Sequence, residues 1–330
     1  VVDQGSEVIS ACAINGSECW EVFNVEEPKY IHISTFAESS IGDDANLGDN
    51  ATALPPDDDQ VMSVLPEAED PTEDEDTAEE ESEDSSTTTV DEPWTYDLFV
   101  SSSTSGTSGP YIYELKKIEK KNTTTELVAH FADGLALDQR SGFLFFTDRT
   151  NSIMRTSLAG KHEHQSYDTL YTYEGSPRGI ALAPSEGYLY WVDDSNAAVM
   201  RGSTDGLSFE TVFTGILEMR DVKLTYDAST GECANMFISS AFDNTIVRTD
   251  CDGGDVTDLL TGFNEVVGMA LDPLHDVIFW ADSTEIHMAN LTTGEYINQI
   301  ADGFTSLSYL DIDVSKGRLY FTHSGDDAVW

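Results

Sequence analysis

A four-residue pattern recurs six times in the chain at nearly constant spacing. Each copy begins with apolar residues, several end on an acid, and successive copies start 47, 45, 47, 42 and 41 residues apart. The copies are LFVS (98–101), FFTD (145–148), YWVD (190–193), FISS (237–240), FWAD (279–282) and YFTH (320–323). A period of this length predicts a repeat architecture in which each copy marks one structural unit.

The residues around each copy predict four strands per repeat. A short apolar run precedes the later copies: DGLALD (133–138), RGIALA (178–183), DVKLTY (221–226), VGMALD (267–272) and SYLDID (308–313). A third strand and a turn follow the middle four copies, and then comes a more variable fourth strand. Such a small meander cannot bury both of its faces alone, whereas meanders stacked around an axis can. The sequence therefore predicts an all-β, six-bladed β-propeller, with the repeated pattern on the second strand of each blade.

The segment RGIALAPSEGYLYWVDDSNAAVMRGSTDG (178–206) resembles the YWTD repeat of the low-density-lipoprotein receptor class. The resemblance covers residues 94–330 and implies that Asp148, Asp193 and Asp282 help to fix neighbouring strands. The repetition leads to the same expectation, because a carboxylate that recurs in successive blades is better explained by strand-end hydrogen bonds than by chemistry needed once.

Composition divides the chain into three parts. Residues 94–330 form the predicted propeller, whose last blade is incomplete at the C-terminal end. Residues 41–93 carry 20 acids and no Lys or Arg, which predicts an extended acidic linker. Residues 1–40 contain three strand-like stretches and predict a β-rich disulfide segment. We expect this segment to pair with a sheet edge, closing either its own sixth blade or that of a neighbouring molecule; chain beyond Trp330 is the other candidate for completing the blade.

The four cysteines predict two local disulfides. Cys12 and Cys19 flank an Asn-Gly turn, which places them opposite each other in a hairpin. If the strands around Phe242 pair so that position 238 faces 246, Cys233 faces Cys251. The pairs lack Cys-x-x-Cys spacing, which disfavours a metal site.

Charge and sequons indicate an extracellular protein, secreted or at the cell surface. The chain holds 62 acids and 16 bases, so we expect no nucleic-acid partner and no anionic membrane partner. No apolar stretch reaches 18 residues, so no membrane insertion is expected. The sequence also starts without a methionine or a leader, which suggests a processed chain. Four Asn-x-Ser/Thr sequons predict N-linked glycans, at Asn15, Asn50, Asn122 and Asn290.

Catalytic and metal-binding patterns are scarce. Asp250, Asp252 and Asp255 weakly resemble a calcium loop, but no glutamate follows at its twelfth position. DGLALDQRSGFLFFTD (133–148) is also similar to repeats of the strictosidine-synthase and calcium-dependent lactonase group. Those enzymes hold calcium or a catalytic acid on the propeller axis. The corresponding residues here are a mixed set that favours a charged rim for a partner: Asp133, Arg178, Asp221, Val267 and Ser308.

The sequence therefore leaves two classes of function. The favoured class is a non-catalytic extracellular module with no cofactor, whose partners are other extracellular proteins or copies of itself. Within it we expect a glycosylated structural subunit of a cell-surface or filamentous assembly, such as the mastigonemes of marine algae, or a ligand-binding receptor ectodomain. The alternative is a calcium-dependent hydrolase. Carboxylates or amides that converge on the axis would favour the enzyme, and an apolar channel would favour the module.

Overall fold

The computed structural model describes residues 7–14, 19–24, 28–33, 96–102, 110–118, 121–159 and 165–324 of the 330. The chain divides into two compact units, residues 1–35 with 93–330 and residues 36–92. The described strands all belong to the first unit, and the predicted linker, residues 41–93, lies outside the described residues. The described part contains no helix with the length and hydrophobicity that a membrane span requires.

The described strands form six four-stranded antiparallel sheets. One sheet is β3 (Pro28–Ile33), β4 (Tyr96–Ser102), β5 (Ile112–Ile118) and β6 (Lys121–Val128). The next two are β7 (Gly134–Asp138), β8 (Phe143–Asp148), β9 (Ser152–Ser157) and β10 (Asp168–Thr172), then β11 (Pro177–Ala183), β12 (Tyr188–Asp193), β13 (Ala198–Ser203) and β14 (Phe209–Thr214). Two more follow: β15 (Met219–Tyr226), β16 (Cys233–Ser240), β17 (Thr245–Thr249) and β18 (Thr257–Thr261), then β19 (Gly268–Asp272), β20 (Val277–Ala281), β21 (Ile286–Asn290) and β22 (Tyr296–Ala301).

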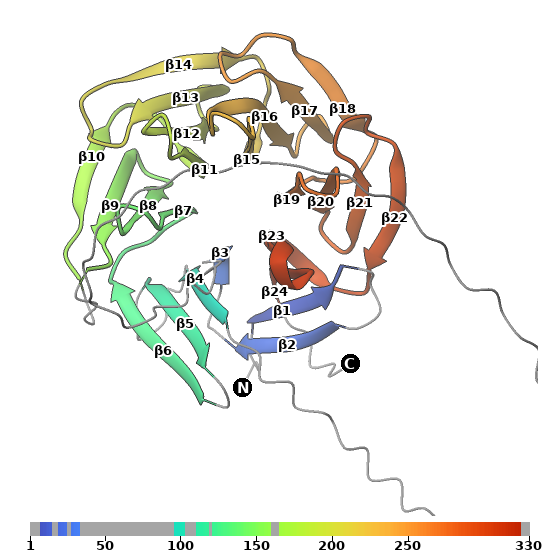
Figure 1. The fold of residues 1–330 in the computed structure, drawn as a ribbon, viewed down its shortest axis with the longest axis horizontal. Helices are drawn as coiled ribbons and strands as arrows, with labels where there is room; N and C mark the ends of the chain where they lie inside the picture. The colour runs from blue at the N-terminus through green and yellow to red at the C-terminus, as the bar shows by residue number, and fades with distance from the viewer. Residues whose placement is uncertain are drawn as a thin grey trace, which may run out of the picture. The chain divides into compact units, whose positions relative to one another are not determined.

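The sixth sheet combines strands from both ends of the described chain. Its order is β23 (Thr305–Asp313), β24 (Arg318–Ser324), β1 (Glu7–Ala13) and β2 (Cys19–Asn24), and a short 3-10 helix, η1 (Val314–Lys316), joins β23 to β24. Figure 1 shows the sheets arranged around a common axis, with the first strand of each next to that axis. These inner strands contact one another in a closed ring, β3–β7–β11–β15–β19–β23 and back to β3. The predicted all-β propeller is confirmed: the four sheets from β7 to β22 are each built from consecutive chain, and the β3–β6 sheet and the composite sheet of β23, β24, β1 and β2 complete the ring.

The second strand of each sheet carries the repeated pattern, as predicted. The copies lie on β4, β8, β12, β16, β20 and β24, with Asp282 directly after β20. Both faces of β12 are buried from Leu189 onwards, because the strand lies between two neighbouring blades. The fourth strands are mostly exposed, as in β14, which explains why their sequences vary more.

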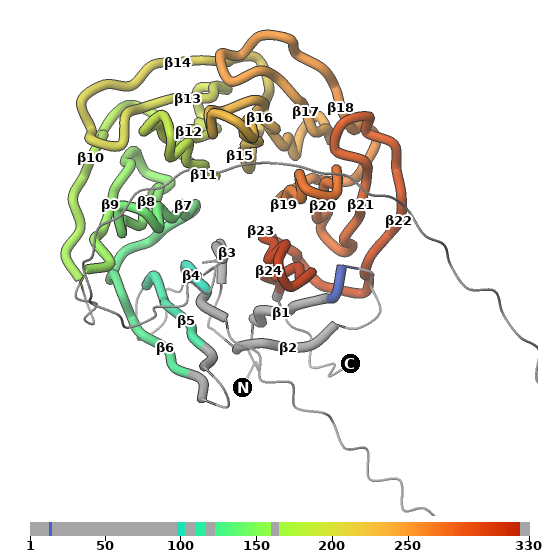
Figure 2. The backbone as a smooth tube through the Cα atoms, viewed as in Figure 1, coloured from blue at the N-terminus to red at the C-terminus, as the bar shows by residue number. Residues whose placement is uncertain are grey.

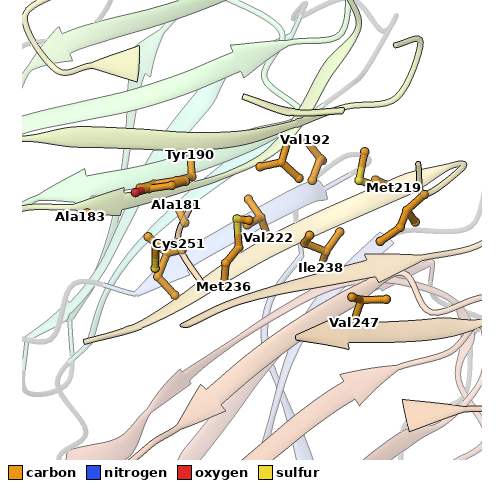
Figure 3. Packing of buried hydrophobic residues seen from close by; sticks show 13 residues of the cluster. Ala181, Ala183, Tyr190, Val192, Met219, Val222, Met236, Ile238, Val247 and Cys251 are labelled. Carbon is orange, nitrogen blue, oxygen red and sulfur yellow. The ribbon is translucent and has the colours of Figure 1, made fainter. Parts of the chain in front are cut away.

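Hydrophobic clusters between neighbouring blades form the core. One lies between the β11–β14 and β15–β18 sheets, where Tyr190 and Val192 pack toward Val222, Met236 and Ile238 (Figure 3). The inner strands approach each other closely at the axis. A Cβ atom on Gly134 would lie 2.5 Å from the carbonyl oxygen of Arg178 in the next blade. Three of the apolar inner runs have glycine as their second residue. A larger residue there would push the neighbouring blades apart.

The N-terminal strands contribute to two adjacent sheets. β1 pairs with β24 from Glu7 opposite Ser324 to Ala13 opposite Arg318, and β2 forms the outer edge. β3 is the inner strand of the following blade, paired with β4. The tube in Figure 2 follows the chain through the four continuous blades from β7 to β22, with β23 and β24 after them. The chain's own N-terminal strands β1 and β2 therefore complete the sixth blade in this structure. The sequence did not predict that β3 would join a different sheet from β1 and β2.

The cysteine positions follow from hairpin pairing. Cys12 on β1 stands opposite Cys19 on β2. Cys233 and Cys251 form a disulfide with Cα atoms 6.0 Å apart. The expected register of that hairpin was wrong by one residue, since Ile238 faces Val247 rather than residue 246. The pair still lies within disulfide reach because bond formation tolerates a range of Cα separations.

We predict that Ser10→Pro destabilises the protein and that Ser10→Ala does not. Ser10 lies in the middle of β1, between β24 and β2, where proline removes a backbone donor and fixes φ. The expected loss is about 1–3 kcal/mol of unfolding free energy, from one unsatisfied ladder group. Chemical denaturation of both variants measures it. Equal midpoints would contradict closure of the ring by β1.

Candidate functional site

The repeated acids cap the turn between the second and third strands of their blades. Asp148 Oδ1 accepts hydrogen bonds from the backbone amides of Thr150, Asn151 and Ser152 at 3.1, 2.9 and 2.9 Å. Asp282 Oδ1 accepts from the amides of Thr284 and Glu285, both at 2.8 Å. Each carboxylate is buried, and its Oδ1 is the oxygen that caps the turn.

Asp193 has the most extensive set of these contacts. Its Oδ1 accepts from the amides of Ser176 and Asn196 at 3.0 and 3.2 Å, and its Oδ2 accepts from the Asn196 side-chain amide at 2.7 Å. Ser176 belongs to the connection from the preceding blade, so this carboxylate joins two blades.

We predict that Asp193→Ala lowers the unfolding free energy by about 1–3 kcal/mol, because buried amide donors lose their acceptor. Glu174→Ala is the matched control, since it removes an exposed acid from the same connection and should change stability little. Thermal and chemical denaturation measure both. A variant at Asp193 as stable as the control would show that the acid is not structural.

The face of the ring at which the inner strands begin carries a network of ion pairs. We call it the N face; it contains the loops that enter each inner strand and the turns between second and third strands. Asp133, just before β7, is fully buried, and Arg149 binds it with Nη2–Oδ1 and Nε–Oδ2 distances of 2.7 and 3.3 Å. Arg178 lies 3.9 Å from the same carboxylate and binds Asp194 at 2.5 Å. The Arg149 side chain remains 47% exposed, so a buried acid holds a cation at the surface.

Two of the predicted rim residues do not reach the surface. Asp133 and Asp221 are both 0% exposed, so the prediction that they form a contact rim was wrong; their carboxylates point into the protein. Asp221 accepts from the amides of Val222 and Met269 at 2.9 and 3.2 Å, which links β15 to β19. The exposed charge on this part of the N face comes from Arg149, a residue that the sequence analysis did not select.

A lysine accompanies Asp221 near the axis. Lys223 Nζ lies 3.6 Å from Asp221 Oδ2. Burial raises the pKa of the Asp221 carboxyl, although the lysine opposes that shift. Burial by itself lowers the pKa of Lys223, but the carboxylates of Asp221 and Asp311 outweigh it, so the pKa of the lysine is raised. The lysine therefore places a positive charge beside the axial acids Asp221 and Asp311.

A cavity of about 250 Å³ has a wall to which five of the inner strands contribute residues. The cavity therefore lies on the axis of the ring. Its lining residues are Leu135, Ala136, Leu137, Ile180, Ala181, Leu182, Pro184, Lys223, Leu224, Tyr226, Leu271 and Asp311. Only two of them are charged, and the Tyr226 hydroxyl donates to the Leu182 carbonyl at 2.6 Å. The described wall is therefore mainly aliphatic with one lysine and one acid, Lys223 and Asp311.

The acids of the weak calcium candidate have other roles. Asp250 caps its turn by accepting from the amides of Asp252 and Gly254 at 2.9 and 2.7 Å. Asp252 points to Arg201 in the adjacent blade, with an Nη1–Oδ1 distance of 2.7 Å. Among the described residues, Asp250, Asp252 and Asp255 do not form a group with metal-ligand spacing, and Asp250 serves the turn as a cap.

Asn290, the sequon residue with a described side chain, occupies the same place in its repeat as Asp250. Its Oδ1 accepts from the amides of Thr292 and Thr293 at 3.1 and 2.7 Å, and its Nδ2 donates to Asp276 at 2.7 Å. Asn122 lies on β6 opposite Lys117. Asn15 and Asn50 lie outside the described residues.

Comparison with known proteins supports the fold. No protein-family model matches the chain. The low-density lipoprotein receptor-related protein 1 of Pyricularia oryzae is 21% identical over 222 residues, which are 62% of this chain and 60% of that protein. A chain in the crystal structure of a nidogen/laminin complex matches with a TM-score of 0.57 and 20% identity, over 64% of this chain and 82% of that one. This chain thus spans 60% of its curated relative, and the similarities agree with the YWTD-type propeller expected from the repeats.

Proposed function

We propose that the chain is an extracellular, non-catalytic module that binds another protein through its N face. The observation that carries this proposal is the half-exposed Arg149, held in place by the buried Asp133. A fixed arginine loses little side-chain entropy on binding and can form paired hydrogen bonds with a carboxylate of the partner. Such arginines are common among the residues that dominate interface energies.

Exposed apolar side chains occupy the same face two blades further along. Leu217 precedes β15 and is 50% exposed, and Phe242 lies in the β16–β17 turn and is 59% exposed. Arg178 and Asp194 lie in the blade between them and Arg149. The proposed surface therefore combines a cation with apolar groups, which suits a protein segment that carries both an acid and a hydrophobic residue.

The relatives support this class of function. One is a low-density lipoprotein receptor-related protein, and the structural neighbour belongs to a complex between nidogen and laminin. These facts concern those proteins, and we extend only protein binding and an extracellular location to this chain. Nothing in the comparisons favours a mastigoneme or another filament, and β1–β3 already take part in sheets of their own chain.

The charged residues near the axis support a hydrolase less well than they support a binding module. Asp133 is neutralised by Arg149 and Asp221 by Lys223, so neither acid is available as a strong calcium ligand without losing its cation. The cavity wall is mainly aliphatic. We therefore propose a module without catalytic residues.

We predict that Arg149→Ala and Phe242→Ser each weaken capture of a secreted partner, the arginine change by roughly 30-fold if it loses about 2 kcal/mol. The immobilised full chain would be incubated with conditioned medium from the source cells, and the retained protein would then be titrated. Arg140→Ala is the matched control, because it removes an exposed arginine at the β7–β8 turn on the opposite face. Retained binding in both N-face variants, or loss in the control, would contradict the proposed surface.

An extracellular location also predicts N-linked glycans on at least two of the four sequons. Intact mass before and after enzymatic deglycosylation of protein from the native source measures them. Asn122→Gln should remove the mass of one glycan if that site is used. An unmodified mass would contradict the secretory assignment while leaving the binding test unaffected.

A further inference from the structure

We propose that Asp282, Glu285 and His287 form a binding site for a zinc-like divalent cation. The three residues lie at the β20–β21 turn of one blade, and their ligating atoms all lie within 4.8 Å of one another. Among the described residues, no other group of His, Cys, Asp and Glu side chains meets this geometry. The set offers one imidazole nitrogen and two carboxylate oxygens, donors that zinc accepts.

The two distances from the imidazole to the carboxylates match the ligand separations of a bound metal ion. His287 Nε2 lies 3.5 Å from Asp282 Oδ2 and 3.4 Å from Glu285 Oε2. Charge-assisted hydrogen bonds are shorter, about 2.7–2.9 Å. Two ligands of a tetrahedral ion with bonds of about 2.1 Å are separated by about 3.4 Å. Asp282 Oδ1 already caps the turn, so its Oδ2 is the oxygen that faces the imidazole.

The equivalent place in another blade shows what the site replaces. Trp191 and Trp280 occupy the same position in their repeats, and each pairs across to the third strand, with Met200 and His287 respectively. In the Trp191 blade, Asp193 Oδ2 accepts from the Asn196 amide at 2.7 Å. The turn of the Trp280 blade is two residues shorter, so Glu285 stands where Ala198 does, opposite the acid. A methyl group and a thioether are thus replaced by a second carboxylate and an imidazole.

These replacements are costly without a cation. Glu285 brings a second negative charge to an acid that is 5% exposed, where its counterpart Ala198 is uncharged. A divalent ion would neutralise both carboxylates and use the imidazole lone pair. The Glu285 side chain is 39% exposed, which provides a path for the ion and for a water ligand.

A second, independent observation comes from the tryptophan. Trp191 Nε1 donates to the Tyr173 hydroxyl at 2.8 Å, and that hydroxyl also hydrogen-bonds to Asp193. Phe263 packs against Trp280 in the corresponding place, with ring centroids 4.6 Å apart, and has no hydroxyl. The buried Trp280 Nε1 has no hydrogen-bond partner among the described residues. By analogy with the Trp191 blade, it points to the space beside Asp282, where a metal-bound water would accept its hydrogen bond.

The imidazole is already oriented for this role. Its ring stacks on Trp280 with centroids 5.2 Å apart and an interplanar angle of 24°. Its Nδ1 faces the Tyr296 hydroxyl at 3.4 Å, which leaves Nε2 to the carboxylates. The carbonyls of Ser283 and Thr284 accept from the amides of Leu307 and Phe304 at the start of the composite sheet. A bound ion would therefore also stabilise the joint to that sheet.

The test is calorimetric titration of the EDTA-treated full chain with ZnCl2 and, separately, with CaCl2. We expect tight binding of one zinc ion, weaker binding of calcium, and a higher melting temperature with zinc. His287→Met and Glu285→Ala install the residues found at the matching positions of the Trp191 blade, Met200 and Ala198, so both should fold. Each should weaken zinc binding by roughly 100-fold or more. Tyr296→Phe should cost roughly 10-fold, as expected for a residue that orients a ligand.

His275→Ala is the control, because His275 is exposed and pairs with Asp272 outside the site. It should bind zinc as the unmodified chain does, which separates the site from weak binding by the many other acids. The proposal is overturned if the chain binds no stoichiometric zinc, if His287→Met binds it equally well, or if calcium binds as tightly and is unaffected by that variant.

Discussion

The fold depends on every sheet having a neighbour on each side. The second strands are buried on both faces, and their large aromatic residues, Trp191 and Trp280 among them, are completely shielded only when the adjacent blade is present. Such a ring has no stable open form, because the blades at a gap would expose their apolar faces to water. The pairing of β1 with β24 closes the gap with strands from both ends of the chain. β3 belongs to the next blade, so the chain that runs from β2 to β3 connects the composite sheet to that blade.

Within that ring, the turns after the second strands provide the local rigidity. One carboxylate oxygen collects the backbone amides of the turn, as Asp148 and Asp282 do, and the other oxygen remains available for a further contact. In the Trp191 blade that contact is the Asn196 amide. In the Trp280 blade the same oxygen faces His287 and lies beside Glu285. The same acid-capped turn is repeated around the ring, and the proposed metal site differs from the other copies by a few substitutions next to that acid.

Charge is arranged differently at the axis and on the N face. At the axis each buried acid has its own cation, Arg149 for Asp133 and Lys223 for Asp221, and the cavity beside them is mostly aliphatic. This pairing reduces the cost of burying these two acids. On the N face the same pairing has an outward consequence, because Arg149 is fixed by Asp133 while much of its guanidinium remains exposed. The proposed protein-binding surface is built on this exposed, fixed guanidinium.

The sequence by itself determined the repeats, the strands and the turns, because these follow from local periodicity. The apolar run before YWVD, the acid that ends it and the hairpin cysteines 233 and 251 all act within one blade. Contacts between blades were decided only by the tertiary structure. Sequence spacing gave no sign that Arg149 reaches Asp133 from a turn, that β3 leaves the sheet of β1 and β2, or that the rim acids are buried. The position of His287 holds an apolar residue in three other blades, Met154, Met200 and Val247. Only the tertiary structure brings His287 together with Asp282, Glu285 and Trp280.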